Sequence, residues 1–352
     1  MEYFDLTIEK CNTIKYNSKT AWHIIFKQKY IEIKDGKNFN ACDSLGILAP
    51  NPEKNIKLFC DAFNLKNIYL EDKKMHFYDY LVDIDINLFP RKEFLRSIEK
   101  NISKKNFLHK ILNTELYNEC VKTYHFIDIT HLLGVKYFDE IDFVKHSDKI
   151  KPRNYILINK PSEKLEIVVT THNFNNLIDK IPNHLMPLKQ GHFTEFLKNN
   201  AFFTRNLHGF VKGNIQLNDF KRNSKKIIFI CSGIGIVSYF SCLNNIESFE
   251  QNIDFNDCEL FYKCHDIENN ILSYFKNNKE KEAYFKGKVH IIYSTKNNSN
   301  FMCKIREKIQ NLSTENIFVS GSFELQKQIY LAVKEISPFI LQEKRLFFDI
   351  WH

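Results

Sequence analysis

The sequence contains no long hydrophobic run. None of its apolar stretches approaches the roughly 20 residues that a membrane-spanning helix needs, and the N-terminus, Met1 to Asp5, does not resemble a signal peptide. Glycine and proline are scarce, with 10 and 8 in 352 residues, which argues against disorder and against simple repeats. These absences predict a soluble, cytoplasmic protein that is long enough for two or three domains.

The nine cysteines follow no metal-binding or disulfide pattern. No Cys-x-x-Cys pair and no Cys/His ligand spacing occurs, so we expect no structural zinc and no other metal site. An odd number of dispersed cysteines is typical of a reducing compartment.

The net charge of +8 is only weak evidence about the partner of the protein. Lysine and asparagine are abundant and alanine is scarce, as in proteins from AT-rich genomes, so the basic surface can reflect mutational bias. The charge would suit an acidic protein partner or an anionic cofactor. No block of basic residues interleaved with aromatics is present, so we expect no nucleic-acid partner.

The first third of the chain changes its hydrophobic period. Alternation over residues 2–17 and 20–34 predicts antiparallel strands, with Asp35-Gly36 as a turn, and 44–48 is a further short strand. Between about 54 and 135 the apolar residues follow helical spacing, notably over 91–120, and Pro90 is expected in the first turn of a helix.

Strand character returns over residues 154–158 and 165–171, and a short helix and a strand are expected near 191–197 and 210–211. After residue 226 strands alternate with helices. The predicted strands are 227–230, 259–263, 289–294 and 316–320, and the predicted helices are 237–244, 267–275, 301–310 and 323–335. This alternation predicts a doubly wound parallel sheet, which binds ligands at the carboxyl ends of its strands. The fold class is therefore mixed: an antiparallel β-barrel with a helical insertion, followed by an α/β domain.

A glycine turn follows the first strand of this α/β region. Ile227 to Ile230 is a buried strand pattern, and Gly233-Ile234-Gly235 then leads into a helix. Strand, glycine turn and helix place a phosphate-bearing ligand at a helix N-terminus. On this stretch alone an ordinary βα turn is the favoured alternative, because a single Gly-x-Gly is weak evidence.

The order of these features resembles the ferredoxin-reductase superfamily, in particular its diflavin-reductase branch. Residues 41–48 (Ala-Cys-Asp-Ser-Leu-Gly-Ile-Leu) are similar to the family stretch Pro-Gly-Asp-x-x-Gly-Val, with Cys42 at a glycine position. Residues 83–94 resemble the Leu-Asp-Ile…Pro-Arg-Arg-x-Phe run of the helical insertion. The resemblance implies an FAD-binding barrel (1–53 and 136–220), a helical connecting insertion (54–135) and an NAD(P)-binding domain (221–352).

The resemblance also implies where FAD would bind. Arg153, Tyr155 and Ile156 match the family motif Arg-x-Tyr-Ser, in which the arginine binds the pyrophosphate and the tyrosine stacks on the flavin. Ile156 replaces the serine that lies near the reactive flavin nitrogen. A surface strand pair is the alternative for the first two residues.

A second FAD-binding segment is implied at residues 191–194. Gly191, His192, Phe193 and Thr194 are similar to the Gly-x-x-Thr/Ser turn that holds the FAD pyrophosphate. A threonine that caps a helix is the alternative.

The NAD(P) side is implied by two further segments. Gly233, Ile234 and Gly235 match the nicotinamide-side glycine turn, with Ile234 at a threonine position. Residues 261–265 (Phe-Tyr-Lys-Cys-His) are similar to Phe-Phe-Gly-Cys-Arg. Ser294, Thr295 and Lys296 correspond to the Ser-Arg stretch that binds the 2′-phosphate of NADPH, and Lys296 would supply the charge that Thr295 lacks. A solvated loop lysine is the favoured alternative for Lys296.

The end of the chain resembles the catalytic region of the family. Ser320 stands at the cysteine position of Tyr-Val-Cys-Gly-Asp, and residues 345–352 match the ending Arg-Tyr-x-x-Asp-Val-Trp. By this resemblance Asp349 orients the nicotinamide and Trp351 covers the flavin ring.

The sequence therefore predicts an FAD-dependent NAD(P)H oxidoreductase, with NADPH as the donor and NADH as an alternative. The chain starts directly at the FAD domain, so the expected acceptor is a separate flavodoxin or an anamorsin-like iron–sulfur protein. The second partner is suggested by Lys151-Pro152-Arg153, which is similar to an Arg-Pro-Arg run in reductases of cytosolic iron–sulfur assembly. A catalytically degenerate scaffold is the alternative, because Ile156, Ile234, Thr295 and Ser320 all depart from the family pattern.

Overall fold

The computed structural model describes residues 3–16, 19–29, 42–160, 163–170, 192–198, 207–213, 226–245, 258–264, 270–276, 288–293 and 299–349. The chain divides into two compact units, which are described separately. Unit 1 comprises Met1–Ile47, Arg153–Thr170 and Gly209–His352, and unit 2 comprises Leu48–Pro152 and Thr171–His208. The predicted Asp35-Gly36 turn and the strand residues 30–34 lie outside the described residues.

A five-stranded parallel sheet forms one half of unit 1. Its order is β12-β11-β10-β13-β14, and the four strands predicted from the sequence are confirmed. The fifth strand, β14, was not predicted as a strand. The bounds are β10 (Ile227–Ser232), β11 (Glu259–Cys264), β12 (Lys288–Tyr293), β13 (Asn316–Ser320) and β14 (Leu346–Asp349).

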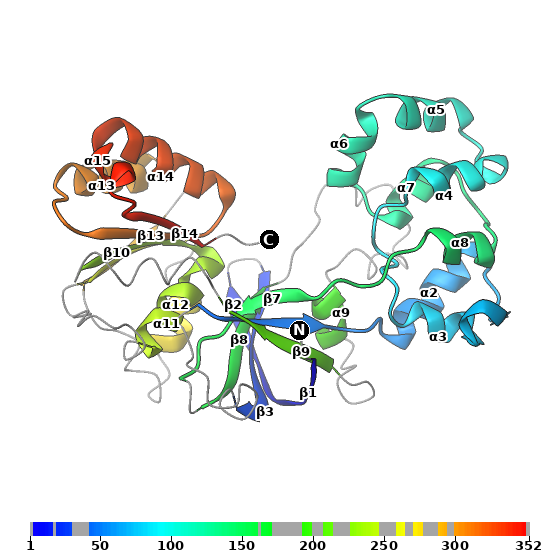
Figure 1. Cartoon of the computed structure of the whole chain (residues 1–352), viewed down its shortest axis with the longest axis horizontal. Helices are drawn as coiled ribbons and strands as arrows, with labels where there is room; N and C mark the ends of the chain where they lie inside the picture. Colours follow the sequence, from blue (N-terminus) through cyan, green and yellow to red (C-terminus); the bar gives the residue numbers. More distant parts are fainter. Residues whose placement is uncertain are drawn as a thin grey trace. The chain divides into compact units, whose positions relative to one another are not determined.

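Helices cover both faces of this sheet, as Figure 1 shows. Alternate residues of β10 point to opposite faces: Phe229 packs in one core with α11 and α12, and Ile228 packs in another with α13 and α14. The doubly wound arrangement of helices is therefore present. The bounds are α11 (Ile236–Asn244), α12 (Ile271–Lys276), α13 (Ser299–Gln310), α14 (Phe323–Ile336) and α15 (Phe339–Gln342).

Two further sheets contain antiparallel strand pairs among the described residues. β2 (Ile8–Tyr16), β3 (Lys19–Lys29) and β8 (Lys164–Thr170) form an antiparallel sheet of three strands. A four-stranded sheet has the order β1-β9-β4-β7, in which β4 and β7 are antiparallel. Its strands are β1 (Phe4–Leu6), β9 (Leu207–Lys212), β4 (Ser44–Leu48) and β7 (Arg153–Ile156). The closure of these strands into a barrel stays a prediction.

One continuous core joins the antiparallel strands to the parallel sheet. Ile156 and Val168 belong to the same buried cluster as Val237 and Phe240 of α11. Beside this cluster, the backbone N–H of Cys42 donates to Ser241 Oγ at 2.8 Å. The regions that the sequence assigns to FAD and to NAD(P) therefore share one apolar interior.

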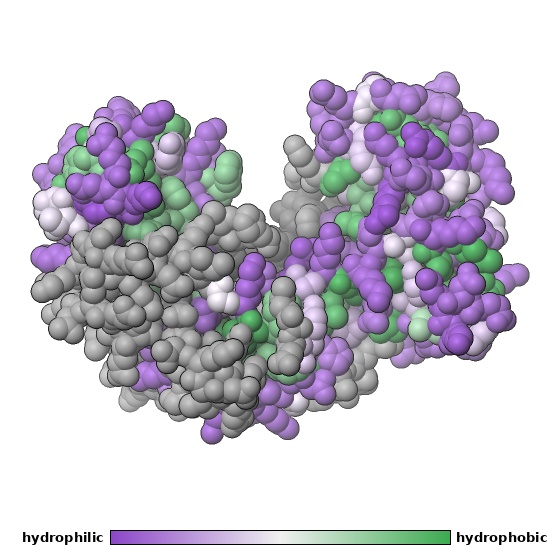
Figure 2. Space-filling view, in the orientation of Figure 1, coloured by the Kyte–Doolittle hydropathy of each residue, from purple (hydrophilic) through white to green (hydrophobic). Residues whose placement is uncertain are grey.

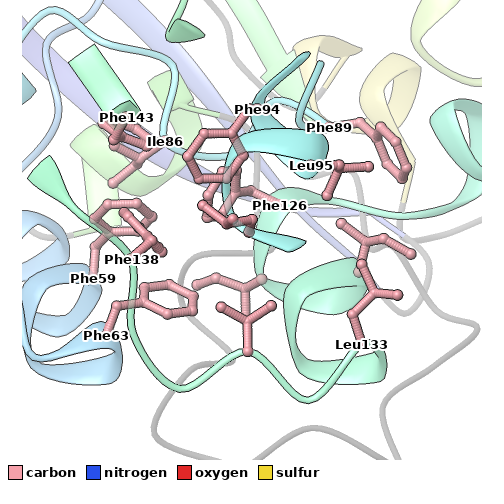
Figure 3. Packing of buried hydrophobic residues seen from close by; sticks show 14 of the residues in the cluster. Phe59, Phe63, Ile86, Phe89, Phe94, Leu95, Phe126, Leu133, Phe138 and Phe143 are labelled. Atoms are coloured by element: carbon pink, nitrogen blue, oxygen red, sulfur yellow. The ribbon is translucent and has the colours of Figure 1, made fainter. Parts of the chain in front are cut away.

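Unit 2 is mainly helical and is built around phenylalanines. Phe59, Phe63, Phe94, Phe126 and Phe143 are buried together (Figure 3), with ring centroids 5.3–5.9 Å apart in several pairs. Figure 2 shows hydrophilic residues over much of the outer surface of these helices, as expected for amphipathic helices around a core.

The helices and strands of unit 2 are short. Its elements are α2 (Glu53–Phe63), β5 (Tyr69–Leu70), η1 (Glu71–Lys73), β6 (Met75–His76), α3 (Phe77–Leu81), α4 (Lys92–Ser97), η2 (Glu99–Asn101), α5 (Lys105–Asn113), α6 (Leu116–Thr123), α7 (Phe126–Leu132), α8 (Glu140–His146) and α9 (His192–Lys198). No helix in the described part of the chain combines the length and apolar character of a membrane span.

The structure corrects three details of the expected helical block. The stretch 91–120 is split among α4, η2, α5 and α6 rather than continuing as one helical pattern. Pro90 precedes α4, because Arg91 is the extended N-cap residue and the helix begins at Lys92. The helices also continue past residue 135, where the carboxylate of Asp139 accepts hydrogen bonds from two backbone N–H groups and starts α8.

Candidate functional site

The strand order of the parallel sheet locates a candidate binding edge. From β10 the chain moves outward through β11 to β12, and it then returns to the other side of β10 to form β13 and β14. Ligands of doubly wound sheets bind at the carboxyl ends of the strands, where this order reverses. The carboxyl ends of β10 and β13 therefore form the candidate binding edge.

The two turns at this edge are tightly fitted to each other. Gly233 has a φ of +56° and Gly321 a φ of +150°, both in the region that favours glycine. A Cβ atom on Gly235 would overlap the backbone carbonyl of Ser320, and one on Gly321 would overlap Ser232 Oγ. The glycines at 235 and 321 thus allow the turns after β10 and β13 to lie against one another.

Two side chains hold these turns in place. The buried Tyr262 donates from its hydroxyl to the carbonyl of Gly233 at 3.2 Å. Gln326 of α14 donates from Nε2 to the carbonyls of Gly321 and Asp349, at 3.1 and 2.9 Å. Gln326 therefore links the carboxyl ends of β13 and β14.

A buried hydroxyl–carboxyl cluster lies behind the turns and consists of Ser238, Ser320 and Asp349. Ser238 and Ser320 both donate to Asp349 Oδ2, at 2.5 and 2.9 Å, and their hydroxyl oxygens are 3.0 Å apart. Asp349 is 6% exposed and the two serines are fully buried. The cluster joins the end of β13, the end of β14 and the first turn of α11.

Burial changes the acidity of the groups in this region. Loss of solvent raises the pKa of Asp349 above its ordinary value of 3.8, although the two serine hydroxyls act in the opposite direction. Burial also raises the pKa of the Cys231 thiol well above its ordinary value. Cys231 is therefore a neutral thiol and a poor nucleophile. Asp349 loses its proton at a higher pH than an exposed aspartate does.

The predicted flavin strand is β7. Arg153 is exposed, and it lies on the same side of the strand as Tyr155 because side chains alternate along a strand. Burial raises the pKa of Tyr155, and the positive charge of Arg153 opposes that shift. Ile156 is buried and packs into the core shared with α11.

The second predicted flavin segment belongs to unit 2. His192 is the first residue of α9, and Phe193 and Thr194 are buried in its first turn. The rings of Phe193 and Phe196 are stacked with centroids 6.4 Å apart. Gly191 lies outside the described residues, as do Ser294, Thr295, Lys296 and Trp351. The roles of these residues stay predictions.

The structure thus brings together part of the predicted site. Gly233, Ile234, Gly235, Ser320 and Asp349 meet at the carboxyl edge of the parallel sheet. The residues that the sequence did not single out are Ser238, Tyr262 and Gln326. The only sequence signal for Ser238 is its place in the helical turn directly after Gly235, which does not show its partner.

Replacing Gly235 with alanine is expected to lower the free energy of unfolding by about 1–3 kcal/mol, because the new methyl group would overlap the backbone at Ser320. Urea unfolding would measure the loss. Gly213→Ala is the matched control: a Cβ there would lie at an ordinary 3.7 Å from Asp43 Oδ1, so a change within about 0.5 kcal/mol is expected. Equal losses in the two variants would contradict the close fit of the turns.

Comparison with known proteins does not assign this chain to a family. No family model matches the sequence, and no curated protein matches it.

Proposed function

We propose that the chain is an FAD-dependent oxidoreductase that takes electrons from NADPH and passes them to a protein acceptor. The observation that carries the proposal is the hydroxyl–carboxyl cluster directly behind two interlocked glycine turns, at the strand-order reversal of a parallel sheet. This is the position at which such sheets bind dinucleotides. The resemblance to diflavin reductases also supports the assignment through the order of its motifs along the chain, from the Arg153 segment to the Asp349 segment.

The residues present suit a dinucleotide. The positive φ of Gly233 and the short turn before α11 leave backbone N–H groups at the start of a helix, where phosphate oxygens are favourably bound. Tyr262 and Gln326 fix the turns, so little ordering would be needed on binding. In the proposal this turn holds the pyrophosphate of the donor.

The residues of β7 suit a flavin in part. Arg153 offers a planar, exposed cation for a pyrophosphate, and Tyr155 offers a ring on the same side of the strand. Thr194 and its neighbours in α9, with Gly191, are proposed as the second FAD-binding segment. Ile156 supplies no hydroxyl, so the chain would have to orient the flavin nitrogen by other groups.

FAD would supply the redox chemistry, since a bound flavin accepts hydride and releases electrons singly. The chain's own groups would set the charge around the donor. As hydride leaves, the nicotinamide ring becomes positive, and an ionised Asp349 would stabilise that charge. Ser238 and Ser320 hold the carboxylate in one orientation. Trp351 is proposed to cover the flavin ring until the donor binds.

The proposed acceptor is a separate flavodoxin or an anamorsin-like iron–sulfur protein. The net charge of +8 suits an acidic electron carrier, because complementary charge increases the rate of encounter.

A catalytically inactive binding protein is the second candidate. It is favoured by Ile156, which occupies the serine position and packs into the core. A protein of this kind would keep the fold and lose hydride transfer.

An anaerobic titration distinguishes the two candidates. We expect the purified protein to show flavin absorbance, and we expect NADPH to bleach it faster than NADH does. Bound flavin that neither donor bleaches would favour the binding protein. A protein that carries no flavin and takes up none when FAD is added would contradict the proposed function.

A further inference from the structure

Cys42 and Cys242 bring two thiols together at the contact between the antiparallel strands and α11. Their Sγ atoms lie 3.7 Å apart, although the two residues are 200 positions apart in the chain. Both side chains belong to the core that the two parts of unit 1 share, with 1% and 0% of their surface exposed. The proposed function makes no use of this pair.

Cys42 has a backbone conformation that is unusual for a residue with a side chain. Its φ of +61° lies in the left-handed region, where a Cβ atom is unfavourable and glycine is preferred. Strained backbone of this kind persists only where surrounding contacts hold it. The N–H of Cys42 donates to Ser241 Oγ at 2.8 Å, and its thiol donates to the carbonyl of Ser238 at 3.6 Å. These two bonds to α11 hold the Cys42 thiol beside Cys242.

The two sulfur atoms need to move little to form a bond. A disulfide places its sulfur atoms about 2.05 Å apart, so this pair must close by about 1.7 Å, which small rotations about the Cα–Cβ bonds can supply. We propose that Cys42 and Cys242 form a reversible disulfide when the protein meets hydrogen peroxide, and that this bond fastens the segment before β4 to α11. In the reducing compartment that the cysteine pattern predicts, such disulfides are transient and respond to oxidants.

The reaction with hydrogen peroxide balances without a further reagent. The sulfur of one cysteine attacks a peroxide oxygen, the O–O bond breaks, and a sulfenic acid and one water form. The sulfur of the second cysteine attacks the sulfenic sulfur, the S–S bond forms as the S–O bond breaks, and a second water leaves. The two thiols together give two electrons and two protons to the peroxide. Burial raises the pKa of the Cys42 thiol well above its ordinary value, so little thiolate is present and we expect a slow reaction.

The bond would close a loop that contains the whole of unit 2. This unit comprises Leu48–Pro152 and Thr171–His208, and both segments lie between the two cysteines in the sequence. A cross-link that closes a long loop reduces the freedom of the unfolded chain and thereby stabilises the fold. The oxidised protein is therefore expected to be more stable than the reduced protein.

The test treats the full-length protein with hydrogen peroxide and then identifies the linked cysteines. Unreacted thiols are blocked with N-ethylmaleimide in denaturant, and the protein is digested with chymotrypsin without reduction. This protease cuts after aromatic residues, so Tyr239 and Phe240 allow Cys242 to be separated from Cys231, another buried thiol of the same core. Mass spectrometry is expected to find Cys42 joined to Cys242, and dithiothreitol should release the two peptides from each other.

Urea unfolding of matched variants shows whether this bond fastens the fold. Oxidation should raise the urea midpoint of wild type by about 1 M, because the closed loop is long. Cys42→Gly, in which the new residue suits the positive φ, and Cys242→Ala should each show no such rise. Cys303→Ser, which removes the exposed cysteine of α13, should form the linked peptide and show the same rise as wild type. If Cys42→Gly does not fold, as judged by circular dichroism, Cys242→Ala carries the comparison.

Three results would overturn the proposal. If peroxide oxidised Cys303 but left Cys42 and Cys242 unlinked, the buried pair would serve packing alone. A link between Cys242 and Cys231 would assign the oxidisable pair to other residues. A linked peptide without a rise in the urea midpoint would show that the bond does not fasten the segment before β4 to α11. Since none of these results concerns the binding of FAD or NADPH, each would leave the proposed function standing.

Discussion

Replacing His23 with leucine is expected to lower the free energy of unfolding by about 3–5 kcal/mol, which is the usual cost of removing one partner from a buried hydrogen-bonded pair that contains a carboxyl group. His23 Nε2 is hydrogen-bonded to Glu166 Oε1 between β3 and β8, and the two residues are 2% and 4% exposed. Without the imidazole, the Glu166 carboxyl would stay buried without its histidine partner. Urea unfolding would measure the loss.

The position of His23 makes the effect extend beyond one sheet. Its Nδ1 lies 3.1 Å from the hydroxyl of Tyr274 on α12, and its ring packs edge-on against Phe275 at 5.2 Å. The residue therefore links the antiparallel strands to a helix of the parallel sheet. We expect His23→Leu to loosen both parts of unit 1 in one transition.

Two further variants make this expectation specific. His109→Leu removes a histidine from an exposed pair with Glu99, and exposed pairs contribute little, so the loss should stay below about 1 kcal/mol. His23→Leu combined with Glu166→Leu should recover part of the lost stability, because the buried carboxyl group is removed together with its histidine partner. A double variant as unstable as His23→Leu, or a similar loss in His109→Leu, would contradict the explanation.

The parallel sheet was predictable because its strands are short β-branched runs, such as Ile227 to Ile230, that alternate with amphipathic helices. The ends of the helices in unit 2 were harder to predict. The spacing of apolar residues over 91–120 is helical throughout, but it does not show where the hydrogen bonds stop, and α4 ends at Ser97. Helix α8 was missed because it is short, although Asp139 is a recognisable N-cap residue.

Contacts between distant segments explain what sequence patterns could not reveal in the site. The φ of Cys42 is +61°, a backbone conformation that glycine adopts more readily than cysteine. Its Sγ lies 3.7 Å from Cys242 Sγ, 200 residues later in the chain, and no local pattern indicates this contact. Ser238 was missed for a related reason: its role depends on Asp349, which lies 111 residues further along the chain.

The position of Asp349 leads to the largest expected effect on activity. Asp349→Asn should reduce the rate of flavin reduction by NADPH about 100-fold, because it keeps the shape of the side chain and removes the charge that stabilises the developing positive ring. The raised pKa of Asp349 gives this expectation a pH dependence. In wild type the rate should rise with pH, over a range that lies above the ordinary aspartate pKa of 3.8, as the carboxyl group ionises. In Asp349→Asn this rise should be absent. Stopped-flow absorbance of the flavin would record both profiles.

Ionisation of Asp349 should lower the stability of the fold, whereas it should raise the rate of flavin reduction. A carboxyl group whose pKa is raised by folding contributes stability at low pH, and that contribution is lost as the pH rises through the folded-state pKa. Asp349→Asn should therefore become more stable relative to wild type as the pH increases from about 4 towards neutrality.

Ser238→Ala is the matched control for activity, since it keeps the carboxylate and removes one hydrogen bond that lowers the pKa of Asp349. Its rate profile should shift to higher pH and reach nearly the wild-type plateau. If Asp349→Asn instead kept the wild-type rate and pH profile, the carboxylate would have no part in hydride transfer, and the hydroxyl–carboxyl cluster would be a structural feature of the sheet edge.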